Sequence, residues 1–178
     1  MFTSRKFQYL RLITYLNASQ LQLCVYILYL MKTLRTNSEN PDFQKLVKQL
    51  DTYLAVMDGD EHGFYDQYNQ IDSLKNCIVI FDNDKAVACG AIKVFDEKTM
   101  EVKRMYTLPE QRGKGLAFAI LKELESWTKE LGYEKTILET GKRQTEAVAL
   151  YGKCGYQVIP NYGQYAGVEN SVCFEKKL

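Results

Sequence analysis

The sequence of 178 residues predicts a mixed α/β fold, in which a mostly antiparallel sheet with one parallel strand pair is flanked by helices. Two apolar runs, at 77–81 and 86–95, flank an Asp-Asn-Asp turn at 82–84, a pattern typical of a β-hairpin. A strand near 101–108 is followed by an amphipathic helix and then by a strand at 136–139. Because the chain must cross over that helix, we expect the later strand to run parallel to the earlier one.

The segment before the hairpin is predicted to contain one strand and two helices. The first strand is expected at 32–36. An asparagine–proline pair then supplies an N-cap and a first-turn proline, and apolar residues at helical spacing predict a helix over 41–56. The polar run 58–63 breaks this helix, and the aromatic-rich stretch 64–71 predicts a second, short one. His62, the single histidine, is therefore expected in a loop.

The segment after the hairpin supplies the rest of the sheet. A turn at 96–98 leads back into a third antiparallel strand, at 101–108. The helix that follows, over 116–131, has one apolar stripe and ends at Gly132. The stripe consists of Leu116, Ile120, Leu124, Trp127 and Leu131. The remaining predicted elements are a strand, a helix and two further strands, at 136–139, 145–153, 156–159 and 171–176.

Length and charge predict one domain without a bulk electrostatic partner. A chain of this size can bury a substantial core, and we assign 31–178 to a single domain. Lysine and arginine total 23 against 22 acidic residues, so no net positive field favours nucleic acid. Five scattered cysteines without a Cys-x-x-Cys pair indicate reduced thiols in a cytoplasmic protein. The same spacing, with one histidine, argues against a metal site.

Residues 1–30 are interpreted as an N-terminal extension, rich in Leu, Tyr and Gln. The apolar run 21–30 is about half as long as a bilayer-spanning helix, so we expect no membrane anchor. Basic residues precede this run, but no small-x-small cleavage site follows it. The favoured interpretation is a dispensable leader, with Met31 as the more natural start. An interfacial or homodimer-packing helix is the alternative, because exposing Tyr26 and its apolar neighbours would be costly.

The most informative stretch connects the strand at 101–108 to the next helix. It reads Arg112-Gly113-Lys114-Gly115-Leu116-Ala117. Glycines let a tight turn direct backbone N–H groups toward one point, and a helix N-terminus adds about half a positive charge there. Such a turn can cradle the phosphate of a ligand, although a plain tight connection would have the same glycine spacing. It lacks the Lys-Ser/Thr ending of a nucleoside-triphosphate loop and the full dinucleotide fingerprint.

Three segments in a fixed order extend this pattern. They are Glu101-Val102-Lys103-Arg104-Met105-Tyr106-Thr107 with Pro109, the turn at 112–117, and Ala147-Val148-Ala149-Leu150-Tyr151-Gly152-Lys153-Cys154-Gly155-Tyr156. Over 101–156 the chain resembles the GNAT superfamily of acetyl-CoA-dependent N-acetyltransferases. The superfamily's phosphate signature is Gln or Arg, two residues, Gly, one residue, then Gly or Ala, and Arg112, Gly115 and Ala117 fill those places. The resemblance implies a GNAT-like central sheet whose parallel strand pair is splayed.

The resemblance also implies that acetyl-CoA is the acetyl donor. The backbone amides expected to hold its pyrophosphate are those of Arg112, Gly113, Lys114, Gly115, Leu116 and Ala117. We expect these amides to contribute more to pyrophosphate binding than the side chains of the same turn. The pantetheine arm is expected between the parallel strands, paired with backbone groups of Met105, Tyr106 and Thr107. Gln144 stands where the superfamily often has Asn, and its longer amide is expected to reach the pantetheine as well.

For the chemistry, the resemblance implies direct attack of an amine on acetyl-CoA in a ternary complex, without a metal or a covalent intermediate. Tyr151 matches the tyrosine that protonates the CoA sulfur. Glu101 falls where some members carry a catalytic glutamate, and Glu139 on the adjacent strand is the second candidate for the base. Such a base is needed because free alkyl amines have a pKa of about 10.4. A backbone N–H near Tyr106 or Thr107 is expected to hold the carbonyl oxygen.

Two other functions stay open at this point. One is a non-catalytic CoA-binding or regulatory module. The other is a partner-binding domain with Tyr162 and Tyr165 in an oligomer interface, although a loop that closes the acceptor pocket is the simpler interpretation of that tail. In the superfamily the segment between the first two strands lies over the acceptor, which makes Phe64, Tyr65 and Tyr68 candidates for substrate contact. The acceptor amine, a small molecule or a protein amine, is not specified by the sequence.

Overall fold

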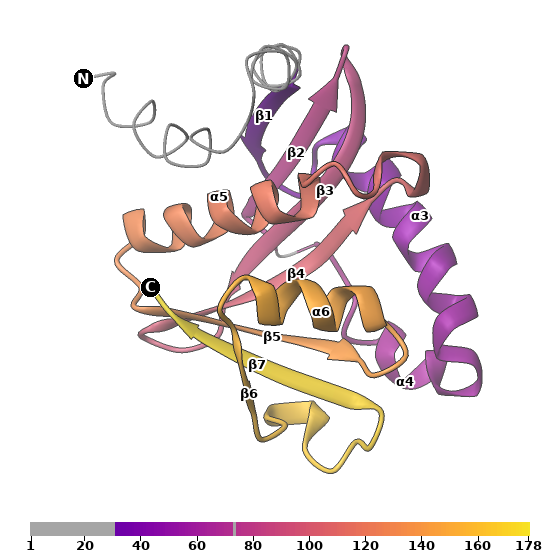
Figure 1. Ribbon diagram of the computed structural model, residues 1–178, viewed down its shortest axis with the longest axis vertical. Helices are drawn as coiled ribbons and strands as arrows, with labels where there is room; N and C mark the ends of the chain where they lie inside the picture. The colour runs from indigo at the N-terminus through magenta and orange to yellow at the C-terminus, as the bar shows by residue number, and fades with distance from the viewer. Residues whose placement is uncertain (1–30, 73) are drawn as a thin grey trace, which may run out of the picture.

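Within residues 31–72 and 74–178, which the computed structural model describes, seven strands form one sheet (Figure 1). The predicted extension 1–30 lies outside the described residues. The strands are β1 (Met31–Thr36), β2 (Asn76–Asp82), β3 (Lys85–Val94), β4 (Thr99–Thr107), β5 (Lys135–Gly141), β6 (Gln157–Ile159) and β7 (Ser171–Lys177), arranged in the order β1-β2-β3-β4-β5-β7-β6. Among these described strands, β4 and β5 run parallel and all other neighbours are antiparallel. The predicted mixed sheet is confirmed.

Helices cover both faces of this sheet (Figure 1). They are α3 (Pro41–Asp58), α4 (His62–Asp66), α5 (Leu116–Glu130) and α6 (Thr145–Lys153). The two long helices, α3 and α5, both contact β2, β3 and β4, and they do so from opposite faces. As predicted, Asn40 caps α3. Its side chain accepts hydrogen bonds from the backbone N–H groups of Asp42 and Phe43. No helix in the described ranges combines the length and the apolarity needed to cross a bilayer.

The hairpin between β2 and β3 has the turn that the sequence predicts. Asn83 and Asp84 adopt φ values of 48° and 62°. Two successive left-handed residues are the mark of a type I′ turn, whose twist matches the twist of the flanking strands. Asn and Asp tolerate this region better than other residues with a side chain, because their short polar groups bond locally.

The parallel strands β4 and β5 separate after a short contact. They pair at Thr99–Lys135, Met100–Thr136 and Glu101–Ile137. β4 then continues to Thr107 and β5 to Gly141 without further pairing between them. The splayed pair implied by the resemblance is therefore present, and the facing edges of both strands are open beyond Glu101.

A β-bulge on the opposite edge of β4 accompanies this separation. The register between β3 and β4 shifts so that Gly90 faces two residues, Arg104 and Met105. Arg104 takes a left-handed φ of 57°. A bulge bends its strand and increases the local twist, which turns the second half of β4 away from β5. The bulge also lies under α5, where a Cβ on Gly90 would come within 2.6 Å of Ile120 Cγ2 and 2.7 Å of Met105 Sδ.

The chain between α3 and β2 differs from the prediction. α3 ends at Asp58, and a 3-10 turn at Gly59–Glu61 leads directly into α4. His62 is the first residue of α4, so its placement in a loop was wrong. The two acidic residues before it favour a helix start, because negative charge is stabilised near a helix N-terminus. The predicted helix at 64–71 correspondingly begins and ends earlier.

The close approach at Gly90 generates a prediction about stability. We expect Gly90→Ala to destabilise the fold by about 1–3 kcal/mol, because the added methyl group overpacks the contact with α5. The measurement is the free energy of unfolding in urea. Gly152→Ala is the matched control, since Gly152 lies in α6 and a methyl group added there would meet no other atom within 4 Å. The control should be as stable as the wild type or slightly more so. Equal stability of the Gly90→Ala protein would show that α5 does not press on the bulge.

Candidate active site

The turn at 112–117 presents backbone N–H groups at the start of α5. Gly113 and Gly115 have φ values of 75° and 78°, which residues with a Cβ rarely adopt. Gly115 occupies the capping position and offers no side-chain oxygen to the helix. Within the described structure, the amides from Gly115 to Phe118 donate no hydrogen bond. Together with the helix dipole, these N–H groups form a site suited to an anion.

The two cations of this turn have partners of their own. Arg112 Nε donates to the Thr107 carbonyl at 3.3 Å, and its guanidinium lies 5.2 Å from the ring centre of Tyr53. Lys114 Nζ donates to the side chain of Gln111 at 2.7 Å. The Thr107 carbonyl thus already accepts one hydrogen bond, and the pairing of its backbone with a ligand stays a prediction.

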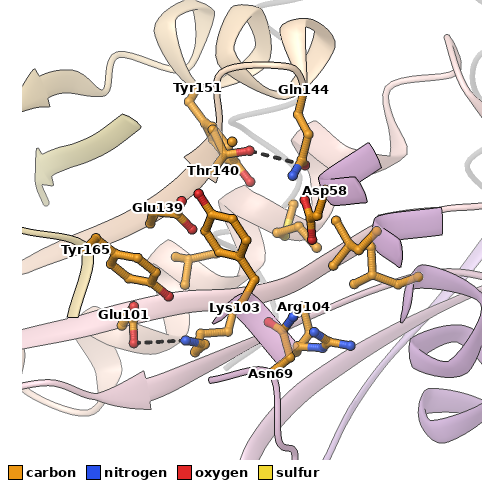
Figure 2. A pocket seen from close by; sticks show the side chains of 16 residues that line it. Asp58, Asn69, Glu101, Lys103, Arg104, Glu139, Thr140, Gln144, Tyr151 and Tyr165 are labelled. Carbon is orange, nitrogen blue, oxygen red and sulfur yellow. Dashed lines mark hydrogen bonds and ion pairs between the residues drawn. The ribbon is translucent and has the colours of Figure 1, made fainter. Parts of the chain in front are cut away.

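A cavity of about 90 Å³ lies where β4 and β5 diverge (Figure 2). Its polar lining includes Asp58, Glu101, Lys103, Arg104, Glu139 and Tyr151. The lining comes from α3, α4, β4, β5, α6 and the segment before β7. The sequence candidates for the base, Glu101 and Glu139, and for the acid, Tyr151, all line this cavity. Glu139 and Tyr151 lie 38 and 50 residues after Glu101 in the chain.

Glu139 is the carboxyl group with the most strongly altered acidity in the cavity. Burial raises its pKa to about 7, an effect that the Ser171 hydroxyl and Lys103 partly offset. Its Oε1 atom is buried and has no hydrogen-bond partner among the described residues. A carboxyl group in this state can exchange a proton near neutral pH.

Glu101, the first sequence candidate for the base, lies on β4 and is engaged with neighbours. Lys103 Nζ lies 3.5 Å from its Oε2, and the Tyr162 hydroxyl donates to its Oε1 at 3.1 Å. The side chains of the Glu101–Lys103 pair are only 10% and 11% exposed. Both carboxylate oxygens of Glu101 therefore have a partner, in contrast to Oε1 of Glu139.

Tyr151 reaches the cavity from α6. Its ring packs at 5.9 Å from Tyr156 and 5.7 Å from Phe174, between ring centres, so its position is set by the core. Its hydroxyl makes no hydrogen bond to any described residue and lines the cavity. Burial, and then the nearby charge of Glu139, raise the pKa of Tyr151 above its usual value. The phenol therefore keeps its proton at neutral pH.

The other predicted ligand contacts lie around the same opening. Met105 lines the cavity on β4, and Tyr106, beyond it, is buried. Gln144 occupies the N-cap position of α6 without a side-chain capping bond, and its Oε1 accepts from the Thr140 hydroxyl at 3.2 Å. This side chain lines the cavity opposite β4, as Figure 2 shows.

Two charged residues of the cavity were missed by reasoning from the sequence. Asp58 is buried at the end of α3, and burial raises its pKa, with His62 and Arg143 acting in the opposite direction. Arg104 is buried at the bulge, where its guanidinium forms an ion pair with Asp51 of α3. The sequence gives no signal for either residue. Asp58 belongs to a polar run of the kind that ends a helix, and the alternation of the strand predicts that Arg104 faces solvent.

An aromatic wall closes one side of the cavity. Tyr65 and Tyr165 line it, and the Tyr65 hydroxyl lies 3.1 Å from the Ser171 hydroxyl. Phe64 and Tyr68 pack edge-on against these rings and do not line the cavity. Of the three aromatic residues named as candidates for substrate contact, Tyr65 is therefore the one that lines the cavity. The tail between β6 and β7 packs over the site, as its simpler interpretation predicts.

Comparison with known proteins agrees with this geometry. The model of the acetyltransferase (GNAT) family matches residues 39–156. The uncharacterized N-acetyltransferase YsnE of Bacillus subtilis (strain 168) is 33% identical over 100 residues, which cover 55% of this chain and 66% of that protein. An IAA acetyltransferase of Azospirillum brasilense is 29% identical over 136 residues, which cover 75% of this chain and 89% of that protein.

Solved structures share the fold. A Klebsiella pneumoniae protein assigned to the acyl-CoA N-acyltransferases has a TM-score of 0.70 and 28% identity, over 83% of this chain and 97% of that one. A GNAT family acetyltransferase from Elizabethkingia anophelis, with acetyl-CoA bound, has a TM-score of 0.62 and 18% identity, over 84% of this chain and 99% of that one. The match of the family model to most of the chain, together with the splayed strands and the glycine turn, shows that this protein belongs to the acetyltransferase (GNAT) family of acetyl-CoA-dependent acyltransferases.

Proposed function

We propose that this protein transfers the acetyl group of acetyl-CoA to a primary amine by direct attack in a ternary complex. One observation carries the proposal. The Glu139 carboxyl, with a pKa raised to about 7, and the protonated Tyr151 hydroxyl line a single cavity at the divergence of β4 and β5. One group is ready to accept a proton at neutral pH and the other to donate one, which is what amine acetylation requires.

The donor is expected to lie along the open edge of β4. The unpaired amides at the start of α5 would hold its pyrophosphate, where the helix dipole adds to the attraction. The pantetheine arm would follow the gap between the parallel strands, with the backbone of Met105 and Tyr106 on one side and the Gln144 amide on the other. Filling the free hydrogen-bonding positions of a buried strand edge favours binding.

The proton and electron movements balance in a single displacement. Glu139 takes a proton from the ammonium form of the acceptor, and the amine nitrogen forms a bond to the thioester carbon. As the carbon–sulfur bond breaks, Tyr151 donates its proton to the departing sulfur. The acylated nitrogen then loses its surplus proton, which restores the Tyr151 hydroxyl through solvent. Glu139 releases the proton that it took from the ammonium group to solvent. A backbone N–H near Tyr106 would stabilise the oxyanion between these steps.

We assign the base to Glu139 rather than to Glu101. The carboxylate of Glu101 already accepts from Tyr162 and lies beside Lys103, so both of its oxygens have a partner. Glu101 would then position Lys103 and, through Tyr162, the segment between β6 and β7. This assignment reverses the order in which the sequence ranks the two residues.

The test of the proposed function is a panel of primary amines with acetyl-CoA and purified protein, in which free thiol release is followed. Amine-dependent thiol release is the expected result. Binding of acetyl-CoA without turnover of any amine would instead favour a non-catalytic CoA-binding module. Failure to bind acetyl-CoA at all would refute both functions.

Glu139→Gln is expected to lower kcat by about 10²- to 10⁴-fold, because the amide cannot accept a proton. In the wild type, kcat/KM should rise with pH up to an apparent pKa near 7, and this rise should disappear in the variant. The measurement is the pH–rate profile, with exposed Glu97→Gln as the charge-matched control. If Glu101→Gln removes the rise and Glu139→Gln keeps it, the two roles are exchanged.

The stability expected for Glu139→Gln shows whether a loss of activity is due to the chemistry or to unfolding. A carboxyl group whose pKa is raised by folding binds more protons in the native state, so it lowers stability as pH rises from about 4.5 to about 7. Glu139→Gln removes this penalty. The variant should therefore be at least as stable as the wild type at pH 8 in urea unfolding, despite its lost activity.

Tyr151→Phe is expected to lower kcat by about 10²-fold or more, with a much smaller change in the KM for acetyl-CoA, because a proton donor acts in the transition state. Tyr156→Phe is the matched control. Its hydroxyl contacts Thr136 at 2.8 Å in the core and does not line the cavity, so it should cost stability rather than turnover. Unchanged kcat in the Tyr151→Phe protein would remove this residue from the mechanism.

Gly115→Glu is expected to abolish acetyl-CoA binding in calorimetry, because the change adds a carboxylate and a strained backbone to the proposed pyrophosphate site. Gly132→Glu is the control, since Gly132 has a similar φ of 88° at the far end of α5. Both variants should lose some stability, but the control should bind acetyl-CoA as the wild type does. Retained binding in Gly115→Glu would refute the assigned phosphate site.

A further inference from the structure

The cations of the cavity are already paired with carboxylates. Lys103 lies 3.5 Å from Glu101, and both side chains are nearly buried. Arg104 has its ion pair with Asp51, which projects from α3 outside the cavity lining. The positive charges that a substrate anion would need are therefore neutralised within the protein.

Asp58 has no lysine or arginine side chain paired with its carboxylate among the described residues, and its ion pair with His62 forms only when that imidazole is protonated. Its side chain is 8% exposed and lines the cavity, and no described residue donates a hydrogen bond to its carboxylate. The nearest basic group is His62 Nδ1 at 3.6 Å, too long for a hydrogen bond. Arg143 lies close, but its N–H groups are directed to the backbone carbonyls of residues 57 and 58 and to Glu61.

Asp58 and the ionised form of Glu139 therefore place negative charge in the cavity, and no described lysine or arginine donates a hydrogen bond to either carboxylate. Their side chains enter it from α3 and from β5, on different sides of the opening (Figure 2). A carboxylate that is nine-tenths buried and accepts no hydrogen bond is costly, and a cation that binds beside it recovers part of that cost. Leu50 and Leu54 line the same cavity from α3 and supply an apolar wall for a short hydrocarbon chain.

We propose that the acceptor is a compact diamine, or a small amine with a second cationic group, and that Asp58 binds the ammonium that does not react. Glu139 serves the amine that does react, so the two carboxylates divide the two nitrogens between them. The inference rests on the proposed acetyl transfer and specifies its substrate class. A cavity of about 90 Å³ restricts the part of the acceptor that enters it to a few heavy atoms. An acceptor carboxylate in the same position would be repelled by Asp58.

The experiment compares acceptors that differ only at the end remote from the reacting amine. Three series are used with the full chain and acetyl-CoA: α,ω-diamines of three to five carbons, alkylamines of the same lengths, and ω-amino acids of the same lengths. The order expected for kcat/KM is diamine, then alkylamine, then amino acid. At the best chain length, kcat/KM for the diamine should exceed kcat/KM for the alkylamine by about tenfold or more. The reason is that the alkylamine has no second ammonium group to pair with the buried carboxylate.

The variant Asp58→Asn tests the residue directly. It should lower kcat/KM for the diamine by about tenfold or more relative to kcat/KM for the alkylamine measured in the same variant. Removing the Asp58 charge also lowers the pKa of Glu139, but that change affects both acceptors and cancels in the ratio. The binding of acetyl-CoA should not change. Asp60→Asn, two residues away and exposed, removes the same charge outside the cavity and should behave as the wild type.

The outcomes separate this inference from the function on which it rests. Equal use of alkylamines and diamines, or a preference for amino acids, overturns the diamine class while acetyl transfer stands. An equal loss for every acceptor in Asp58→Asn shows a structural role and also overturns it. Acetyl-CoA binding without turnover of any acceptor refutes the acetyl transfer itself.

Discussion

The separation of β4 from β5 is the constraint on which the rest of the structure depends. Two parallel strands that stayed paired along their length would satisfy each other's backbone groups and leave no site between them. Here pairing stops at Glu101, and the bulge opposite Gly90 turns the end of β4 away. The absence of a side chain at Gly90 lets α5 pack directly on that bulge. The same helix then begins beside the opening, so one packing arrangement positions both the amides of the glycine turn and the gap between the strands.

The electrostatics of the cavity follow from how each carboxyl group is partnered. Glu101 has a lysine and a tyrosine hydroxyl at its oxygens, whereas Glu139, on the neighbouring strand, has a buried oxygen without a partner among the described residues. The raised pKa of Glu139 thus comes from the surroundings of this one side chain and not from its chemical type. The buried Tyr151, held between aromatic rings, supplies the complementary group that stays protonated. One low-dielectric opening in the sheet thus brings together a carboxyl group that can exchange a proton near pH 7 and a phenol that keeps its proton.

Most of the fold and part of the site could be predicted from the sequence. Periodicity and turn residues were sufficient for the strands, for α6 and for the type I′ turn at Asn83 and Asp84, because these depend on local backbone preferences. The region around His62 was misjudged, since a glycine signals that one helix ends but not that another begins three residues later. The ranking of Glu101 over Glu139 stays a prediction, and the sequence alone could not show their surroundings. Tyr162, which contacts Glu101, and Ser171, which contacts Glu139, lie more than 30 residues further along the chain.

The sequence by itself determined the order of the elements, the glycine turn before α5 and the family to which that turn belongs. These features are local, because a hydrophobic period or a left-handed glycine can be recognised within a few residues. Only the tertiary structure decided which side chains share the cavity and what charge they bear there. Asp58 and Arg104 show why: each looks like an ordinary polar residue in its own element. Burial and the proximity of distant residues, which set the charge of Asp58 and the ion pair of Arg104, exist only once the chain has folded.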